Sequence, residues 1–386
     1  MKPDEPSRPT NSRMTATPYV SFVTYGRNDA YTPSYVRRVN RAMACLARQL
    51  ESAGIDGEII IADWNPPAGR PHLIDILDVP SHLRHVSIRG IVVEPEHHLA
   101  FAGAAERAIH AGEAANVGLR RARGRFVTPK ASDTFFSPQA IAMLARRDLD
   151  EGTMYRIDRH DIVAEDEAIW QLDDDALLAK LQCLPSRPHA WIRQSEHWGL
   201  RNLHTNACGD FTLMALRHWH RLRGHPHDDT VLTLDIDSLV MHAAAALGVR
   251  ECRWPDDCRI YKPRHENLSN ARISQVWSSW QRALDKVLSQ RVGREAALGA
   301  RIFFDYPRRK IRGVESVIGP SIERNFVAPA SRWALGSKPP AWQPENWGLA
   351  DVTLEERVIC QADWETIPLA RRKVPPKVKL SADHHD

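Results

Sequence analysis

The sequence predicts an α/β fold in which a mostly parallel sheet is covered by helices on both faces. Strand-like and helix-like segments alternate through the first 145 residues, which is the order that parallel strands with crossover helices require. The strand-like segments are short and rich in β-branched residues, whereas the helix-like segments repeat apolar residues at steps of three and four. Together these patterns favour parallel strands joined by helices.

The predicted elements follow one another along the chain. A first strand over 19–25 ends at the turn 26–29, and a helix with apolar residues from Val36 to Leu50 then runs until Gly54. The later predicted strands cover 58–63, 85–93, 125–128 and 154–162. The later predicted helices cover 104–123, a segment that opens at Pro138, a short helix capped from Asp173 to Asp175, and 235–247.

Composition bounds the class of protein without indicating its chemistry. The 386 residues are 43% hydrophobic and 26% charged, with a net charge of +4, so disordered and fibrous classes are excluded. So small a positive excess does not favour a nucleic-acid partner. No apolar run reaches the roughly 18 residues of a membrane span, and the polar start 1–18 lacks a signal-peptide core. We therefore expect a soluble, cytoplasmic protein.

Polar residues gather where three predicted strands end. They occupy 24–29, 63–65 and 130–133. In parallel α/β sheets, ligands bind outside the carboxyl ends of the strands. The sequence therefore predicts a binding site at this edge of the sheet.

An ordered set of motifs makes a family resemblance specific. The chain carries, in order, TYGRND, EIIIADWNPP, ANVGL, RARG, FVTPKASDTFFSP, CGDFTLM and LDIDSLV. Over roughly 19–265 this series resembles the GT-A fold of family 2 glycosyltransferases, as a divergent member. The resemblance implies an inverting transfer of a sugar, hexosyltransferase-like, from a nucleotide-sugar to a hydroxyl of a carbohydrate or lipid-linked acceptor. It also implies a place in polysaccharide biosynthesis and assistance by Mg²⁺ or Mn²⁺.

The resemblance assigns a donor site to the first strand ends. A carboxylate can accept hydrogen bonds from a nucleobase imide or from ribose, and arginine can meet phosphate charge. Plain turn chemistry remains the alternative for Arg27 and Asn28, a loop or helix cap for Asp63, and a polar helix-interior position for Asn116. The residues expected to hold the donor are Thr24, Arg27, Asn28, Asp63, Asn116 and Lys130.

The expected metal site departs from the family pattern. Asp133 matches the last acid of the metal-binding DxD motif, but Ala131 stands where the first aspartate would be. A cation bound to diphosphate needs at least one carboxylate, and the Lys130 ammonium can neutralise part of the diphosphate charge. His265 falls where some relatives place a histidine near the metal, with a structural or exposed role as the alternative. The expected metal ligands are Asp133 and His265.

Two further segments supply the expected acceptor site and catalytic base. Asp210, in the CGDF segment, can bind sugar hydroxyls, and Trp219 can stack on a sugar face; a core position is the alternative for the tryptophan. An inverting transfer needs one ionised carboxylate near the acceptor hydroxyl, and a helix N-terminus favours that state. We assign the base to Asp237 and the helix cap to Asp235, while the reverse assignment stays open.

The domain organisation and a rival function complete the expectations. We expect a disordered leader (1–18), a GT-A-like domain (19–270), a helical or irregular C-terminal extension (271–375) and a disordered tail (376–386). Basic clusters at 308–312 and 371–373 can touch the inner membrane surface, or they are a solvated charged face. Because Ala131 replaces an acid, a non-catalytic module that binds nucleotide or sugar is the alternative function.

Overall fold

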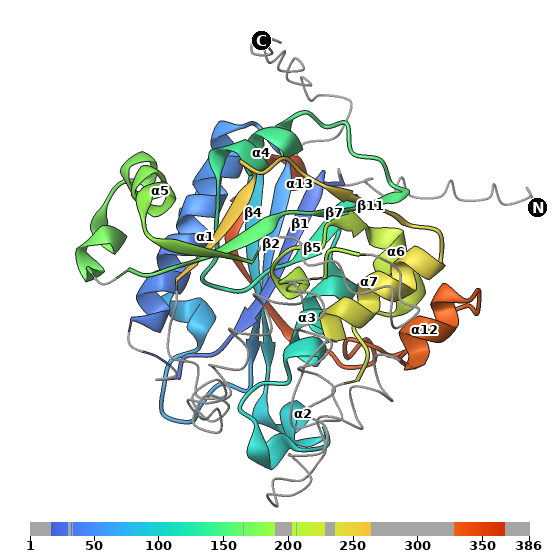
Figure 1. Cartoon of the computed structure of the whole chain (residues 1–386). Coiled ribbons are helices and arrows are strands. Elements are labelled where there is room, and N and C mark those ends of the chain that lie inside the picture. The colour runs from blue at the N-terminus through green and yellow to red at the C-terminus, as the bar shows by residue number, and fades with distance from the viewer. Residues whose placement is uncertain are drawn as a thin grey trace, which may run out of the picture.

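The computed structural model describes residues 17–29, 32, 34–164, 166–189, 203–205, 207–227, 236–263 and 328–366. A seven-stranded sheet runs through the middle of the molecule (Figure 1). Its strands, in spatial order, are β10 (Met214–Ala215), β5 (Phe126–Pro129), β1 (Val20–Gly26), β2 (Gly57–Trp64), β4 (Val86–Val93), β13 (Glu355–Ala362) and β3 (His82–Leu83).

The centre of this sheet is parallel. Strand β1 pairs in parallel with β2 and β5, and β2 pairs in parallel with β4. Strands β10 and β13 flank this centre and run antiparallel to β5 and β4. Every residue of β2 and β4 is buried, as parallel strands covered on both faces require. The predicted mixed, mostly parallel α/β fold is therefore confirmed.

Helices cover both faces of the sheet. Helices α1 (Tyr35–Ser52), α4 (Pro138–Ala145) and α5 (Asp174–Cys183) share one apolar core with strand residues such as Phe22 and Ile59. Helices α3 (Ala111–Arg121), α6 (Leu216–Leu222) and α7 (Ile236–Ala246) share a second core with Val23 and Ile60, and α12 (Ala328–Ala334) joins them. In Figure 1, α1 lies left of the sheet, and α3, α6, α7 and α12 lie to its right.

Two helix starts follow the chemistry that the sequence predicted. Pro138 is at the first position of α4, and the Ser137 hydroxyl accepts the N–H of Ala140 at 3.3 Å. The Asp173 carboxylate caps α5 by accepting the N–H of Ala176 at 2.8 Å. These caps satisfy backbone donors that have no partner within the helix.

The predicted helix over 104–123 is shorter than expected. Residues 104–106 form only a 3₁₀ turn, η2 (Ala104–Glu106), and α3 begins at Ala111 after an extended His110. The reason is tertiary, because the carbonyl of Ala108 accepts hydrogen bonds from Arg27 at 3.2 Å and from Asn65 at 3.0 Å. These bonds fix the intervening loop to the ends of β1 and β2.

Shorter sheets lie beside the main one. The strand-like stretch 154–162 divides into β7 (Thr153–Arg156) and β8 (Asp158–Ile162), which join different sheets. One sheet has the order β6 (Phe135–Phe136), β12 (Arg259–Pro263), β8 and β9 (Ser186–His189), and the other pairs β7 with β11 (Arg250–Arg253). The short elements are η1 (Leu73–Ile76), α2 (Pro95–Leu99), η3 (Glu167–Gln171), η5 (Cys208–Asp210) and α13 (Asp363–Thr366).

Part of the expected C-terminal extension belongs to the main sheet. Strand β13 pairs antiparallel with β4 over residues 355–360, where the sequence predicted helical or irregular structure. The sequence EERVICQA does not read as a strand, because only Cys360 and Ala362 of it are buried. A strand whose neighbours cover it so little shows no clear apolar alternation. The sequence pattern therefore could not predict this pairing.

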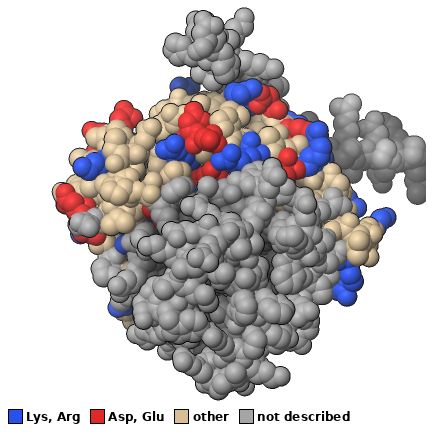
Figure 2. Space-filling view, in the orientation of Figure 1, with Lys and Arg blue, Asp and Glu red and all other residues tan. Residues whose placement is uncertain are grey.

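Two surface features bear on possible partners. None of the helices in the described part of the chain has the length and hydropathy needed to cross a membrane. Figure 2 shows acidic and basic side chains intermixed along the upper rim of one face. The basic clusters at 308–312 and 371–373 lie outside the described residues.

Candidate functional site

The parallel register brings the predicted strand-end residues to one edge of the sheet. Gly26 at the end of β1 pairs with Asp63 near the end of β2, and Thr24 pairs with Ile61. On the other side of β1, the N–H of Lys130 donates to the carbonyl of Val23 at 2.8 Å. The segments after β1, β2 and β5 therefore meet where the sequence predicted a ligand site.

Thr24 and Asp63 each present a buried polar atom without a hydrogen-bond partner. Both side chains are at most 1% exposed, and neither Thr24 Oγ1 nor Asp63 Oδ1 is paired within the described structure. The other oxygen of Asp63, Oδ2, accepts the N–H of Ile74 at 3.3 Å. Burial raises the pKa of Asp63 to about 6, although backbone N–H groups act in the opposite direction. Such orphaned atoms mark places where a ligand can supply the missing bond.

The turn residues after β1 are engaged in holding loops. Arg27 donates to the Ala108 carbonyl and forms an ion pair with Asp29 at 3.3 Å. Asn28 donates to the carbonyl of Pro71 at 2.9 Å. The structure thus places both residues at the expected edge, where their side chains order the neighbouring backbone.

A cluster of charges follows β5. Asp133 Oδ2 lies 3.2 Å from Nε of Arg38, the fourth residue of α1, and both side chains are buried. The ammonium of Lys130 donates to the carbonyls of Ala131 at 2.7 Å and Ser132 at 3.3 Å. Burial lowers the pKa of Lys130 to about 7, while Asp133 and Asp210 act in the opposite direction. Arg38, Lys130 and the carboxylate of Asp133 therefore lie together after the end of β5.

This donor set does not fit a divalent cation. The described residues contain no group of three or more His, Cys, Asp or Glu side chains able to hold a metal. The carboxylate of Asp133 is already paired with a guanidinium, and Lys130 occupies the carbonyl of Ala131. Hard cations need several oxygen ligands, and the one carboxylate here faces a guanidinium and lies beside an ammonium that repel a second cation. The other expected ligand, His265, lies outside the described residues.

Asp210 lies in a second charge cluster beside the first. It is 4% exposed, and its carboxylate meets Arg159 of β8 at 2.5 Å and Lys262 of β12 at 3.4 Å. Although burial acts to raise the pKa of Asp210, these two cations hold it down at about 2. Asp210 therefore remains ionised at neutral pH, and it fixes two cations near Lys130.

The predicted base Asp237 packs directly on this segment. It is the second residue of α7 and is partly exposed, and its Oδ1 accepts the N–H of Ser238 at 3.0 Å. A Cβ added to Gly209 would lie only 2.7 Å from Asp237 Oδ2, so the glycine allows the carboxylate to approach η5. The structure thus places Asp237 against Gly209, the residue before Asp210. Asp235 lies outside the described residues.

Two expected ligand-binding residues have structural positions instead. Trp219 is fully buried in the core, and its indole donates to the Val127 carbonyl at 3.0 Å, so neither ring face is open to a sugar. Asn116 is also fully buried, and its amide bonds both backbone groups of His225. The stacking role for Trp219 is wrong, and Asn116 differs from expectation because its hydrogen-bonding groups face protein backbone.

The structure adds Arg38, Arg159 and Lys262 to the site. Arg38 carried one signal in the sequence, because it shares a helical face with Ala42 and Cys45 at steps of four and seven, a spacing typical of a buried position. Arg159 and Lys262 are brought together by the parallel pairing of β8 and β12. No local pattern reveals such a long-range pairing.

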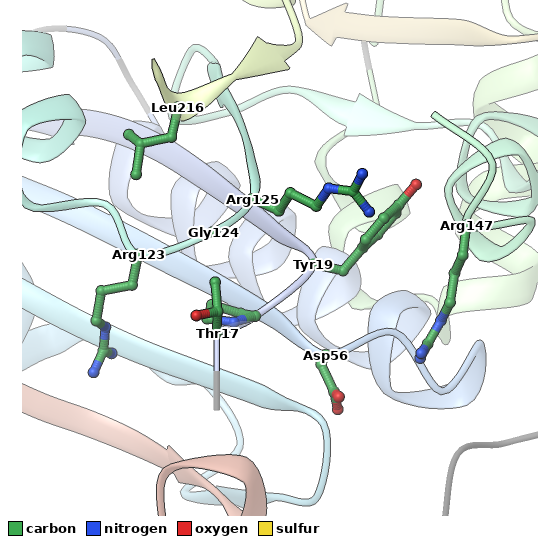
Figure 3. Close-up of a pocket in the computed structure, with 9 residues that line it drawn as sticks. Thr17, Tyr19, Asp56, Arg123, Gly124, Arg125, Arg147 and Leu216 are labelled. Carbon is green, nitrogen blue, oxygen red and sulfur yellow. The ribbon is translucent and has the colours of Figure 1, made fainter. Parts of the chain in front are cut away.

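A pocket of about 380 Å³ lies at the opposite edge of the sheet. It is lined by Tyr19, which precedes β1, and by Asp56, Arg123, Arg125 and Arg147 (Figure 3). These arginines already have partners within the protein. Arg123 pairs with Glu58 and Glu365, Arg125 pairs with Glu151, and Arg147 donates to the carbonyl of Gly54. None of the predicted site residues lines this pocket.

Comparisons with known proteins give distant structural likenesses. No family model and no curated protein matches this chain. Among solved structures, S. aureus TarS 1-349 in complex with UDP-GlcNAc is similar, with 11% identity and a TM-score of 0.40, over 82% of this chain and 80% of that one. A second structure of S. aureus TarS has 11% identity and a TM-score of 0.34, and the match covers 72% of this chain and 43% of that one. At these TM-scores, neither similarity assigns this chain to a family.

Proposed function

We propose that this protein is a GT-A glycosyltransferase that moves a sugar from a nucleotide-sugar to a hydroxyl acceptor. One observation carries the proposal: two orphaned buried polar atoms, Thr24 Oγ1 and Asp63 Oδ1, lie at the strand edge that also carries the Lys130 cluster. A nucleotide-sugar presents the matching sequence of groups, because a neutral nucleoside with hydrogen-bond donors is joined to an anionic diphosphate.

The donor's nucleoside fits the first part of this edge. A base imide N–H or a ribose hydroxyl donating to Asp63 Oδ1 would satisfy the orphaned carboxylate oxygen. Thr24 Oγ1 offers both a donor and an acceptor beside it. In this proposal Arg27 and Asn28 act as positioning residues, since their side chains already bond the neighbouring loops.

The transfer itself is assigned to Asp237. Its carboxylate takes the proton from the acceptor hydroxyl while the acceptor oxygen attacks the anomeric carbon. The bond from that carbon to the diphosphate oxygen breaks, and the nucleoside diphosphate leaves with the electron pair. Direct displacement inverts the anomeric centre. Asp210 follows Gly209, on which the base packs, and in this proposal its ionised carboxylate also accepts hydrogen bonds from sugar hydroxyls.

The finer assignments are part of the same proposal. Membership of family 2, hexosyl transfer and a role in polysaccharide biosynthesis are supported by the ordered motifs from TYGRND to LDIDSLV. A carbohydrate or lipid-linked acceptor suits a base that is partly exposed on α7.

The test is transfer and hydrolysis with a panel of nucleotide-sugars, comparing Asp237→Asn with the exposed-acid control Asp175→Asn. We expect Asp237→Asn to lower kcat by about 10²- to 10⁴-fold, because the general base is lost, while the affinity for nucleotide-sugar is retained. The control removes the same charge on α5, away from the site, and should behave as wild type. Undiminished turnover by Asp237→Asn would refute the assigned base.

A binding module without catalysis is the second candidate. The observation that favours it is the single acid at the DxD position, since Ala131 replaces the first aspartate and Asp133 is paired with Arg38. The same panel separates the two functions. Saturable binding of a nucleotide-sugar that the wild-type protein never turns over would select the module.

A further inference from the structure

We propose that Arg38 and Lys130 bind the donor's diphosphate in place of a divalent cation. This inference rests on the proposed function, because it concerns the same donor site. It follows from the disagreement between the expected metal ligands and the charges that the structure places there.

Arg38 reaches the site from a rigid position. It lies on α1, is 5% exposed, and its guanidinium contacts Asp133 Oδ2 at 3.2 Å and donates to Thr32 Oγ1 at 2.9 Å. A guanidinium stays charged at every physiological pH and presents a planar fork of donors that matches phosphate oxygens. Asp133 therefore holds a permanent cation at the carboxyl edge of β5.

Lys130 supplies the second cation on the same loop. Its side chain is 1% exposed, and the ammonium is held by the carbonyls of Ala131 and Ser132. An ammonium has three donors, and these carbonyls use two of them in the described structure. An anion placed beside this group would satisfy the third donor and favour the charged form.

The charge balance supports the replacement. Two carboxylates with a divalent cation carry a net charge of zero, whereas Asp133 with Arg38 and Lys130 carries +1 when both bases are protonated. The protein groups alone thus provide as much positive charge for a leaving diphosphate as a metal-bound DxD motif. The same two cations repel a divalent ion that approaches Asp133.

A second charge cluster lies beside the first. Arg159 and Lys262 flank Asp210, and the field of Asp210 acts on Lys130. Arg159 also pairs with Asp161 at 2.9 Å, so this second cluster is balanced in charge, and the net positive charge at the end of β5 comes from Arg38 and Lys130. A diphosphate there would meet fixed cations that need no cofactor to assemble.

The test is calorimetric titration of the full-length protein with pyrophosphate and with UDP, in EDTA and in MnCl₂. We expect Kd values in the two buffers to agree within about twofold, since protein cations supply the charge. Arg38→Ala should weaken both ligands about tenfold or more, the loss expected of a charge-assisted hydrogen bond. The matched control is Arg37→Ala, one residue away on α1, where the side chain is exposed and pairs with Glu167; it should bind as wild type.

Each other outcome decides against the proposal. Binding that requires Mn²⁺, no binding of pyrophosphate in either buffer, or unchanged affinity in Arg38→Ala would each overturn it. If Arg38→Ala does not fold, the same titrations of Lys130→Gln, together with the wild-type Kd values in EDTA and in MnCl₂, still test the proposal. Metal-free pyrophosphate binding in a protein that turns over no nucleotide-sugar would uphold this inference and refute the transferase.

Discussion

Asn116 holds both backbone polar groups of His225 from the interior of α3. Its Oδ1 accepts the N–H of His225 at 2.6 Å, and its Nδ2 donates to the carbonyl of the same residue at 3.0 Å. Gln343 donates to that carbonyl at 2.8 Å, so the C-terminal segment shares the contact. Asn116 thereby ties α3 to the loop after α6, and Gln343 joins the segment before β13 to the same carbonyl.

Asn116→Ala is expected to destabilise the fold rather than to act on ligand binding alone. The change leaves the buried N–H of His225 without its partner, which costs about 1–3 kcal/mol in the free energy of unfolding. Urea denaturation measures this loss, with the exposed Asn346→Ala as the control. Full stability combined with lost nucleotide affinity would instead show that Asn116 contacts the donor.

Asp63 should give the stability a recognisable pH dependence. Its pKa is about 6 in the folded protein against 3.8 for the ordinary group, so the folded state binds the proton more tightly. The resulting stabilisation is complete below the unfolded pKa and is lost as the pH rises through about 6. Wild type should therefore lose up to about 3 kcal/mol relative to Asp63→Asn between these pH values. Parallel pH profiles of the two proteins would contradict the raised pKa.

Two glycines of α3 should respond in opposite ways to alanine. A Cβ at Gly118 would lie 2.4 Å from Val23 Cγ1 on the buried strand β1, and we expect a loss of about 1–3 kcal/mol from overpacking. At Gly112 the nearest atom would be at 3.5 Å, so Gly112→Ala should gain up to about 1 kcal/mol in helix propensity. Thermal unfolding of the two variants checks the difference, and equal effects would show that α3 does not pack this closely on β1.

Trp364 tests whether the C-terminal segment is part of the main fold. Its ring is 1% exposed, its indole donates to the His85 carbonyl at 3.1 Å, and Arg123 lies over the ring. Trp364→Ala should therefore cost about 3–5 kcal/mol, measured by denaturant titration of the whole chain. The control Val358→Ala, in the same segment but 67% exposed, should change the stability by no more than about 0.5 kcal/mol. A small effect at Trp364 would show that this segment is separable.

The sequence by itself determined the α/β class and the edge of the sheet at which we propose the donor site. The strands and helices of the first 145 residues are encoded by local periodicity, by caps such as Ser137, and by glycines that end elements. The carboxyl edge of the sheet follows from that order, because parallel strands bring their polar ends together. This order predicted that Thr24, Asp63 and Lys130 lie at that edge, and the structure places them there.

Only the tertiary structure decided which charged side chains lie together at this edge. The pairing of Asp133 with Arg38 joins residues 95 positions apart, and Asp210 meets Arg159 and Lys262 across 51 and 52 positions. The burial of Trp219 likewise shows that it is a core residue, whereas the sequence also allowed it to stack on a sugar. The physical reason is that local patterns record periodicity and turn chemistry, whereas the electrostatic environment and desolvation of a side chain depend on segments distant in the sequence.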